Sequence, residues 1–180
     1  MKMKPIHALL AAALCASSFA ATAAITKDQH KAATKDAEMT YKSAKSACSA
    51  LAGNAKDVCV AEAKVVKASA IAKTDAEYKD TVKARAAGQK DVASAEYDLA
   101  KAKCGSKAGN EKDVCIKEAK AVEVRAKADA KAGTKVSEAR TDASDEKRKA
   151  NYKVAAEKCD AFSGDTKDVC IKEAKARFKM

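Results

Sequence analysis

The sequence predicts an all-α protein built of elongated antiparallel helical hairpins, and two observations support this fold class. The chain is 34% charged and 4% aromatic, with a single proline, Pro5. By itself this composition fits a one-domain globular protein, a long helical protein or a disordered one. The second observation favours helices: the segment from Cys104 to Lys120 has near-copies at 48–64 and 159–175, and each copy encodes a turn between two helices.

The first 24 residues have the features of a signal peptide. Lys2 and Lys4 form a basic start, residues 8–13 form a short apolar core, and residues 21–23 form an A-x-A cleavage site. The apolar run is shorter than the ~20 residues that a membrane-spanning helix needs. We therefore expect no transmembrane segment once the signal peptide is removed.

Cleavage is expected after Ala23 or Ala24, which leaves residues 25–180 as a single elongated helical domain located in the periplasm. Processing removes Cys15, so six cysteines remain, and an even number of cysteines in an exported chain predicts disulfides. Processing also removes two lysines, which takes the formal net charge from +11 to +9. The mature protein is therefore expected to be basic.

The repeat is defined by three cysteine pairs with the same spacing. The first cysteines of successive pairs lie 56 and 55 positions apart, and such self-similarity is typical of a stacked or arrayed helical unit. In each copy a tyrosine, an alanine and the first cysteine stand at i, i+3 and i+7, which places them on one helical stripe. These residues are Tyr41, Ala44 and Cys48; Tyr97, Ala100 and Cys104; Tyr152, Ala155 and Cys159.

A glycine follows the first cysteine of each pair by five residues and predicts the end of a helix. Glycine is favoured just past a helix C-terminus because it readily adopts a positive φ. The next residue, asparagine or aspartate, is a preferred N-cap, and an aspartate three residues further on is expected at N3, where its charge favours the helix dipole. The predicted cap residues are Gly53, Asn54, Asp57, Gly109, Asn110, Asp113, Gly164, Asp165 and Asp168.

The second helix of each hairpin begins about one turn before the second cysteine. Two further stripes are expected to face the first helix, Cys59, Ala63 and Val66 in one copy and Cys115, Ala119 and Val122 in the next. The two cysteines of each copy would then meet across the hairpin. Six cysteines allow 15 pairings, and the repeated spacing favours three local disulfides: Cys48 to Cys59, Cys104 to Cys115 and Cys159 to Cys170.

The predicted disulfides compensate for a weak apolar core. After processing, Leu51 and Leu99 are the remaining leucines, and alanine supplies most of the apolar content. An alanine buries much less apolar surface than a leucine, at ~25 cal/mol per Å². Closing a loop of about a dozen residues contributes up to ~3 kcal/mol, so the disulfides are expected to staple the turns.

Four helices are expected between these turns, two short and two long. Continuous long helices would form an antiparallel stalk, with the turn at 104–115 at its tip and the turns at 48–59 and 159–170 at its base. The alternative is three hairpins hinged at Gly88 and Gly133. A helical glycine costs only ~1 kcal/mol, which favours continuity. The expected helices span residues 25–52, 55–107, 111–161 and 166–180.

No catalytic, cofactor or metal site is predicted. His30 is the one histidine left after processing and is expected to be exposed, so a Ser-His-Asp or Cys-His nucleophile is not expected. Structural zinc sites use closely spaced pairs such as C-x2-C, which the repeat lacks. The lysine-rich and aspartate-rich segments around each second cysteine are explained by capping and i,i+4 pairing, and the repeated tyrosines by hairpin packing.

The basic charge is the feature that bears most on function. Lysine-rich helices attract anionic polymers such as lipopolysaccharide phosphates, anionic lipids or nucleic acid. The exported location and the scarcity of aromatic residues argue against nucleic acid. The alanine-rich face lacks the large apolar residues that anchor a helix at a membrane surface. Lysines spread around a helix are also typical of a simple solvated face.

The leader, the Ala/Lys-rich helices and the thrice-repeated C-x10-C with GN or GD and KDVC resemble a group of short secreted proteins of Gram-negative bacteria. These proteins are labelled TolA-like or cell envelope biogenesis proteins. The resemblance covers residues 25–180 and implies a component of the cell envelope. TolA itself is similar in the composition of its long helical region, but its membrane anchor and globular C-terminal domain are not expected here, so the resemblance does not imply a role in the Tol system.

These observations lead to the expectation of a periplasmic, non-enzymatic structural or interaction protein of the envelope. Its partner is expected to be an envelope protein or an anionic envelope polymer, neither of which the sequence identifies, and the oligomeric state is left open. An alternative is a holdase chaperone whose basic arms, similar to those of Skp, hold unfolded outer-membrane proteins. A binder of anionic envelope polymers is a further alternative.

Overall fold

The computed structural model describes residues 24–180, which form five α-helices, and within this range no strand occurs. The all-α class predicted from the sequence is confirmed. The predicted signal peptide, apart from Ala24, lies outside the described residues. Short 3-10 turns follow α1 and α3. The helices are α1 (Lys27–Ala47), α2 (Gly53–Lys79), α3 (Val82–Lys103), α4 (Gly109–Cys159) and α5 (Gly164–Phe178).

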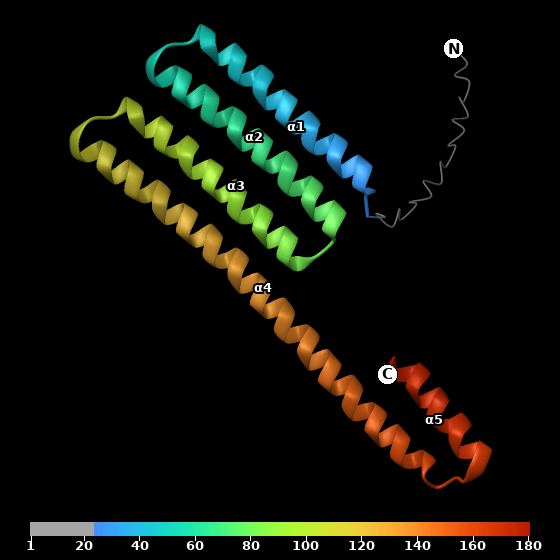
Figure 1. Cartoon of the computed structure of the whole chain (residues 1–180). Coiled ribbons are helices and arrows are strands. Elements are labelled where there is room, and N and C mark those ends of the chain that lie inside the picture. The colour runs from blue at the N-terminus through green and yellow to red at the C-terminus, as the bar shows by residue number, and fades with distance from the viewer. Residues whose placement is uncertain (1–23) are drawn as a thin grey trace, which may run out of the picture.

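Helices α1, α2, α3 and the first half of α4 lie side by side in one antiparallel layer, which we call the four-helix body (Figure 1). Each helix of the layer packs on its neighbours in the sequence. Helix α4 has 51 residues, so it is about 75 Å long at 1.5 Å per residue, and its second half extends beyond the body. Helix α5 folds back along this second half and forms a separate hairpin at the far end (Figure 1).

The first of the two expected long helices is interrupted, but not at Gly88. Helix α2 ends at Lys79, and its C-cap residue Asp80 has a left-handed φ of 40°. Helix α3 begins after Thr81, whose hydroxyl accepts a hydrogen bond from the Ala84 backbone N–H at 3.1 Å. A left-handed aspartate costs about 1 kcal/mol, which the Thr81 cap and the α2–α3 packing offset. Two hairpins therefore fold side by side.

Both glycines proposed as hinges lie inside helices. A β carbon at Gly88 would stand 2.7 Å from Ala72 Cβ and 3.1 Å from Ala72 Cα. Gly88 therefore allows α2 and α3 to approach closely, which explains a glycine in the middle of a helix. Gly133 has open space where its side chain would be, and α4 continues through it as predicted.

The expectation that the middle turn is the far tip of a stalk is wrong. The turns at 48–59 and 104–115 lie at the same end of the body, and the turn at 159–170 lies at the far end of α4 (Figure 1). The first two turns also touch, because a β carbon on Gly105 would collide with the side-chain oxygen of Asn54. The break at residues 80–81 reverses the chain once more than expected, and this reversal brings the second turn beside the first.

Alanine and cysteine form the buried interior. The first cysteine of each pair, Cys48, Cys104 and Cys159, is 1% exposed, and eight alanines are buried along the helix seams. Val66 and Val122, predicted to face the first helix of their hairpins, are instead more than half exposed. Their neighbours Ala63 and Ala119 face inward as predicted. The small side chains allow close helix packing but leave both broad faces of the layer open to solvent.

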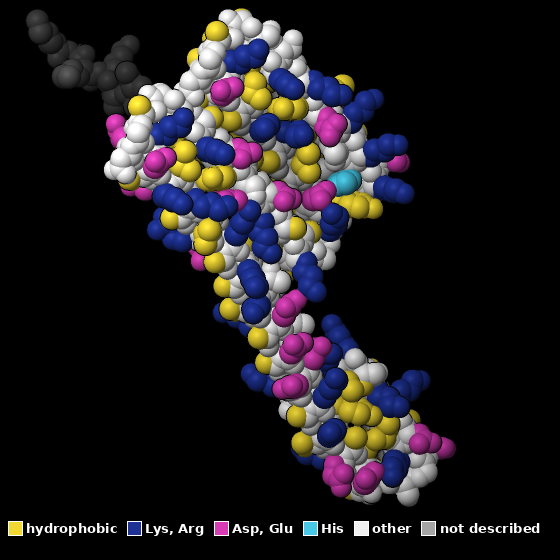
Figure 2. Space-filling view, turned by 60° about the vertical axis from the view of Figure 1, so that its left-hand side comes forward, with side chains coloured by type: hydrophobic (Ala, Val, Ile, Leu, Met, Phe, Trp, Pro, Cys, Tyr) yellow, Lys and Arg dark blue, Asp and Glu magenta, His cyan; other side chains and the backbone are white. Residues whose placement is uncertain are grey.

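The surface of the described chain carries basic side chains on every helix. Figure 2 shows lysine and arginine side chains spread over the visible face, with acidic side chains between them and hydrophobic rows along the seams. Over residues 24–180, no helix combines the length and the apolar character that a membrane crossing requires.

Candidate functional site

The three cysteine pairs form the disulfides predicted from the spacing. Cys48 bonds Cys59, Cys104 bonds Cys115, and Cys159 bonds Cys170, with Cα–Cα distances of 5.7, 5.8 and 5.7 Å. These distances lie within the usual range for disulfides. Each bond joins the end of one helix to the second turn of the next. The disulfides are structural elements of the three turns and contribute no open reactive group.

The glycines of the turns adopt the predicted backbone conformation, with φ of +55° at Gly53, +50° at Gly109 and +56° at Gly164. The prediction of asparagine or aspartate as N-cap differs from the structure. Each helix begins at the glycine itself, so the N-cap residues are Ala52, Ala108 and Ser163, and none of them makes a side-chain capping bond.

The residues predicted to cap these helices have other positions. Asn54, Asn110 and Asp165 lie inside the first turns of their helices, and Asp57, Asp113 and Asp168 follow in the second turns. The sequence predicted that each of these helices begins just after the asparagine or aspartate, because both are preferred N-cap residues. This prediction fails because the helical hydrogen bonds already begin at the residue before the glycine, as where the Lys112 N–H donates to the Ala108 carbonyl oxygen at 3.3 Å.

A groove crosses the four-helix body on one face. It runs between α2, α3 and α4 and has a volume of about 790 Å³. Its floor consists of small residues, among them Ala72, Ala86, Gly88, Ala130 and Gly133. Because these side chains end at the β carbon or before it, the groove is shallow and follows the helix axes.

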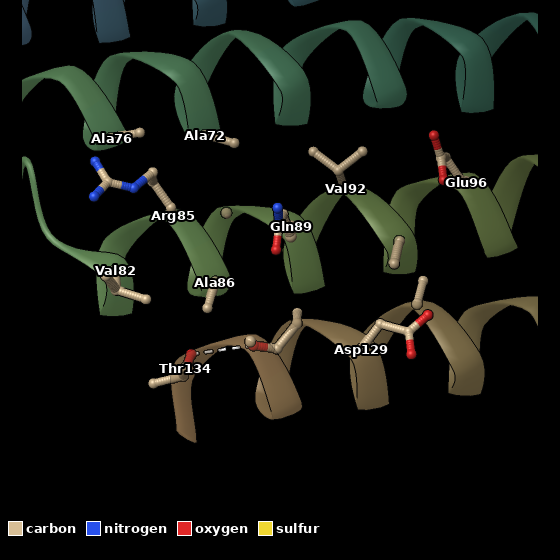
Figure 3. Close-up of a pocket in the computed structure, with 15 residues that line it drawn as sticks. Ala72, Ala76, Val82, Arg85, Ala86, Gln89, Val92, Glu96, Asp129 and Thr134 are labelled. Carbon is tan, nitrogen blue, oxygen red and sulfur yellow. Dashed lines mark hydrogen bonds between the residues drawn. The ribbon is translucent and has the colours of Figure 1, made fainter. Parts of the chain in front are cut away.

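The walls of the groove carry polar side chains of both charges. Arg85, Gln89 and Glu96 line it from α3, and Asp129 lines it from α4 (Figure 3). The Thr134 hydroxyl donates to the Ala130 carbonyl oxygen at 3.1 Å and closes one end. The arrangement offers an apolar floor with charged and amide groups at the rim, which suits the side of a helix better than a compact small molecule.

A polar cluster clasps α1 to α2 at the end opposite the first two turns. His30 Nε2 lies 2.6 Å from Asp75 Oδ1, and the His30 ring stacks on Tyr78 at 4.5 Å between centroids. Lys79 Nζ donates to Asp75 Oδ2 at 2.7 Å. The Lys79 and His30 hydrogen bonds hold the pKa of Asp75 below its usual range.

The sequence-based expectation that His30 is exposed is wrong, because its side chain is 22% exposed. The contacts explain why the sequence did not reveal them: Asp75 is 45 positions away along the chain, and no local pattern links the two residues. With Asp75 and Tyr78 as its partners, His30 holds two helices together. Over residues 24–180, no three His, Cys, Asp or Glu side chains gather in a way that could hold a metal ion.

A second cluster joins α3 to α4 around Glu123, which is 5% exposed. Lys120 and Lys127 each donate to its carboxylate at 2.6 Å. The Lys120 ammonium also lies 4.8 Å from the centre of the Tyr97 ring. The two hydrogen bonds, Lys120 first, lower the pKa of Glu123 from its usual 4.5 to about 2, and the same bond raises the pKa of Lys120.

The cluster explains the role of the repeated tyrosines in the first two hairpins. Lys67 lies 4.8 Å from the centre of the Tyr41 ring, as Lys120 does from Tyr97. Both rings are half-buried and contribute to hairpin packing, as the sequence predicted. Sequence reasoning missed Glu123, although lysines three residues before it and four after it were a readable signal.

Replacing Glu123 with glutamine should change the acid stability of the protein in a defined pH range. The folded-state pKa of Glu123 is lowered, so its carboxylate contributes stability above pH 4.5, and this is lost as the pH falls from 4.5 to about 2. The free energy of unfolding of wild type should therefore approach that of Glu123→Gln across this window. Urea unfolding at several pH values measures it, with Glu38→Gln as an exposed control. If the free energies of unfolding of wild type and Glu123→Gln differ by the same amount at every pH, this role of Glu123 is contradicted.

The comparisons with known proteins give no match for this chain, whether with family models, curated proteins or solved structures.

Proposed function

We propose that the protein is exported to the periplasm and is a non-catalytic interaction component of the cell envelope, as the resemblance to TolA-like proteins implies. The observation that carries this proposal is the single layer of helices with a groove of about 790 Å³ across one face. The groove is open to solvent along the helices rather than enclosed within a core. Such a surface is suited to binding an elongated partner along the helices.

Two further features support an envelope location and a binding role. Three disulfides staple the turns, and structural disulfides persist in oxidising compartments such as the periplasm. The groove has a floor of small residues such as Ala86 and Ala130 and a rim that includes Arg85 and Asp129. A partner helix can approach such a floor closely and pair with charges on both walls.

A photo-crosslinking residue placed at Gln89 tests the groove directly. Gln89 is exposed at the rim, and Ala87, exposed on the same helix but outside the groove, provides the matched control. In envelope extract, the Gln89 probe should give a discrete crosslinked species heavier than the chain, and the Ala87 probe should not. Reduction of the disulfides before crosslinking should weaken the product. No product at Gln89, or equal products at both positions, would count against the groove.

A holdase chaperone is the second candidate, because the described surface exposes apolar side chains in several places. Val66, Val122 and Val124 are more than half exposed, and Phe162 is about half exposed at the third turn. Exposed apolar groups are the feature that a holdase uses to bind unfolded clients. Light scattering of an unfolded outer-membrane protein distinguishes the two roles. Suppression by stoichiometric protein supports a holdase, and unchanged aggregation rejects it.

A further inference from the structure

Helix α4 has a free edge along its whole length. Helices α3 and α5 lie on the same side of α4 (Figure 1), so the opposite side has no neighbour in the described chain. This side carries small and apolar residues at helical spacing, and all of them are exposed. We call it the outer edge of α4; it consists of Ala121, Val124, Ala128, Ala132, Ala139, Ala143, Ala150 and Val154.

The repeat shows that both halves of this edge correspond to surfaces that pack against each other inside the body. Helix α2 meets α3 at Ala72 and Gly88. The offset of 56 between the first two copies relates Ala72 to Ala128, and the offset of 55 to the third copy relates Gly88 to Ala143. The same offsets relate Val65, Ala68 and Ala76 to Ala121, Val124 and Ala132, and Ala84, Ala95 and Leu99 to Ala139, Ala150 and Val154, whereas the buried Ala61 corresponds to Lys117.

The third hairpin cannot reach its equivalent position within the same chain. The second hairpin follows the first through the turn at Asp80 and Thr81. In the next repeat of the same chain, the position that corresponds to this turn is Val136, and there α4 continues without a turn. The half of the edge that corresponds to α2 (residues 121–132) and the half that corresponds to α3 (residues 139–154) therefore lie on one straight helix. Both halves point to the same side, so they cannot pack against each other within one chain.

We propose that a second copy of the chain pairs with this edge, so that two α4 helices pack antiparallel around a two-fold axis. Ala128 of one copy would then lie opposite Ala143 of the other, and Ala143 opposite Ala128, which puts the axis between Lys135 and Val136. The third hairpin of each copy extends the helical layer of its partner. Each third hairpin would then pack on the partner subunit as the second hairpin packs on the first within the chain, in a symmetric interface where the same surface of both copies meets.

Charges at the edge fit this register. Across the α2–α3 seam, Lys103 Nζ lies 3.6 Å from Glu62 Oε1. The repeat offsets relate Glu62 to Glu118 and Lys103 to Lys158, so the same charges are retained. Neither Glu118 nor Lys158 makes a salt bridge within residues 24–180. In the dimer each Glu118 would face Lys158 of the partner subunit, twice per assembly. Ala143 replaces the close-packing Gly88, so the α4 axes lie farther apart than those of α2 and α3.

Light scattering coupled to size-exclusion chromatography tests the dimer on the purified, oxidised protein over a dilution series. Wild type should have twice the mass of the chain. The double variant Ala128→Glu/Ala143→Glu buries four carboxylates in the seam and should be monomeric, whereas Ala87→Glu on the exposed side of α3 should remain dimeric. A monomeric wild type at every concentration, elongated or compact, would overturn the proposal. A dimer that survives the double variant would also overturn it.

A charge swap tests the register of the dimer. Glu118→Lys places like charges at two sites of the seam and should raise the dimer Kd by about tenfold, a salt-sensitive effect of the size expected for two exposed pairs. Lys158→Glu should act similarly, and the double swap Glu118→Lys/Lys158→Glu should restore wild-type affinity. If the losses of dimer affinity caused by the two single substitutions simply add in the double swap, the two residues do not face each other.

Discussion

Replacing Cys159 and Cys170 with alanine should release α5 from α4 while the four-helix body stays folded. Helix α5 has 15 residues and packs on α4, with Ala174 as its one buried side chain. Isolated helices shorter than about 12 to 15 residues are marginal in water. Loss of the closed loop removes about 3 kcal/mol from this hairpin, so a short helix with one buried side chain should no longer stay docked on α4.

Hydrogen exchange measured by mass spectrometry checks this prediction. Amides of residues 164–178 should lose most of their protection in the double variant, and amides of α2 and α3 should keep theirs. The matched control is Cys48→Ala/Cys59→Ala, where α1 has 21 residues and keeps the His30–Asp75 clasp to α2. Protection of α1 should therefore fall less than that of α5. Unchanged protection of α5 would show that its packing is sufficient without the disulfide.

Replacing Gly88 with leucine should destabilise the body by about 2 to 3 kcal/mol. A β carbon at this position would already stand 2.7 Å from Ala72 Cβ and 3.1 Å from Ala72 Cα, and the backbone atom cannot move aside. Overpacking of this kind typically costs 1 to 3 kcal/mol, and the loss of close packing between α2 and α3 places the effect in the upper part of that range.

Gly133→Leu is the matched control and should have the opposite sign. Nothing lies within 4 Å of a β carbon at Gly133, so the substitution should raise the free energy of unfolding by up to about 1 kcal/mol through helix propensity. Urea unfolding followed by circular dichroism measures both variants, at one protein concentration because a dimer makes stability concentration-dependent. Equal effects at the two positions would contradict the close approach of α2 and α3.

The features that the sequence predicted correctly are local. The disulfides join cysteines 11 positions apart, and the left-handed glycines and the stripe from Tyr41 to Cys48 extend over two helical turns. Within such short distances, helical geometry leaves few alternatives. The three hairpins, the continuous α4 and the alanine seams all follow from these local patterns.

The arrangement of the hairpins could not be predicted in the same way. It depends on a break at Asp80 and Thr81, where the sequence has neither glycine nor proline. Thr81 is a good N-cap, but threonine also stands in the middle of helices here, as Thr74 and Thr134 do. Gly88 looked like the weaker point because a glycine that allows close packing and a glycine that bends a helix look the same in the sequence.

Two hairpins lie side by side, and the third lies at the far end of a continuous α4. Pulsed electron resonance measures this with spin labels on unnatural amino acids at Lys56, Lys112 and Lys167, one near each turn, in samples diluted with unlabelled protein. We expect a short distance between labels 56 and 112 and a distance of about 75 Å between labels 112 and 167, the length of α4. A short distance between labels 112 and 167 would show that α4 folds back. A long distance between labels 56 and 112 would show that the first two turns lie apart. Either result would contradict this arrangement of the hairpins.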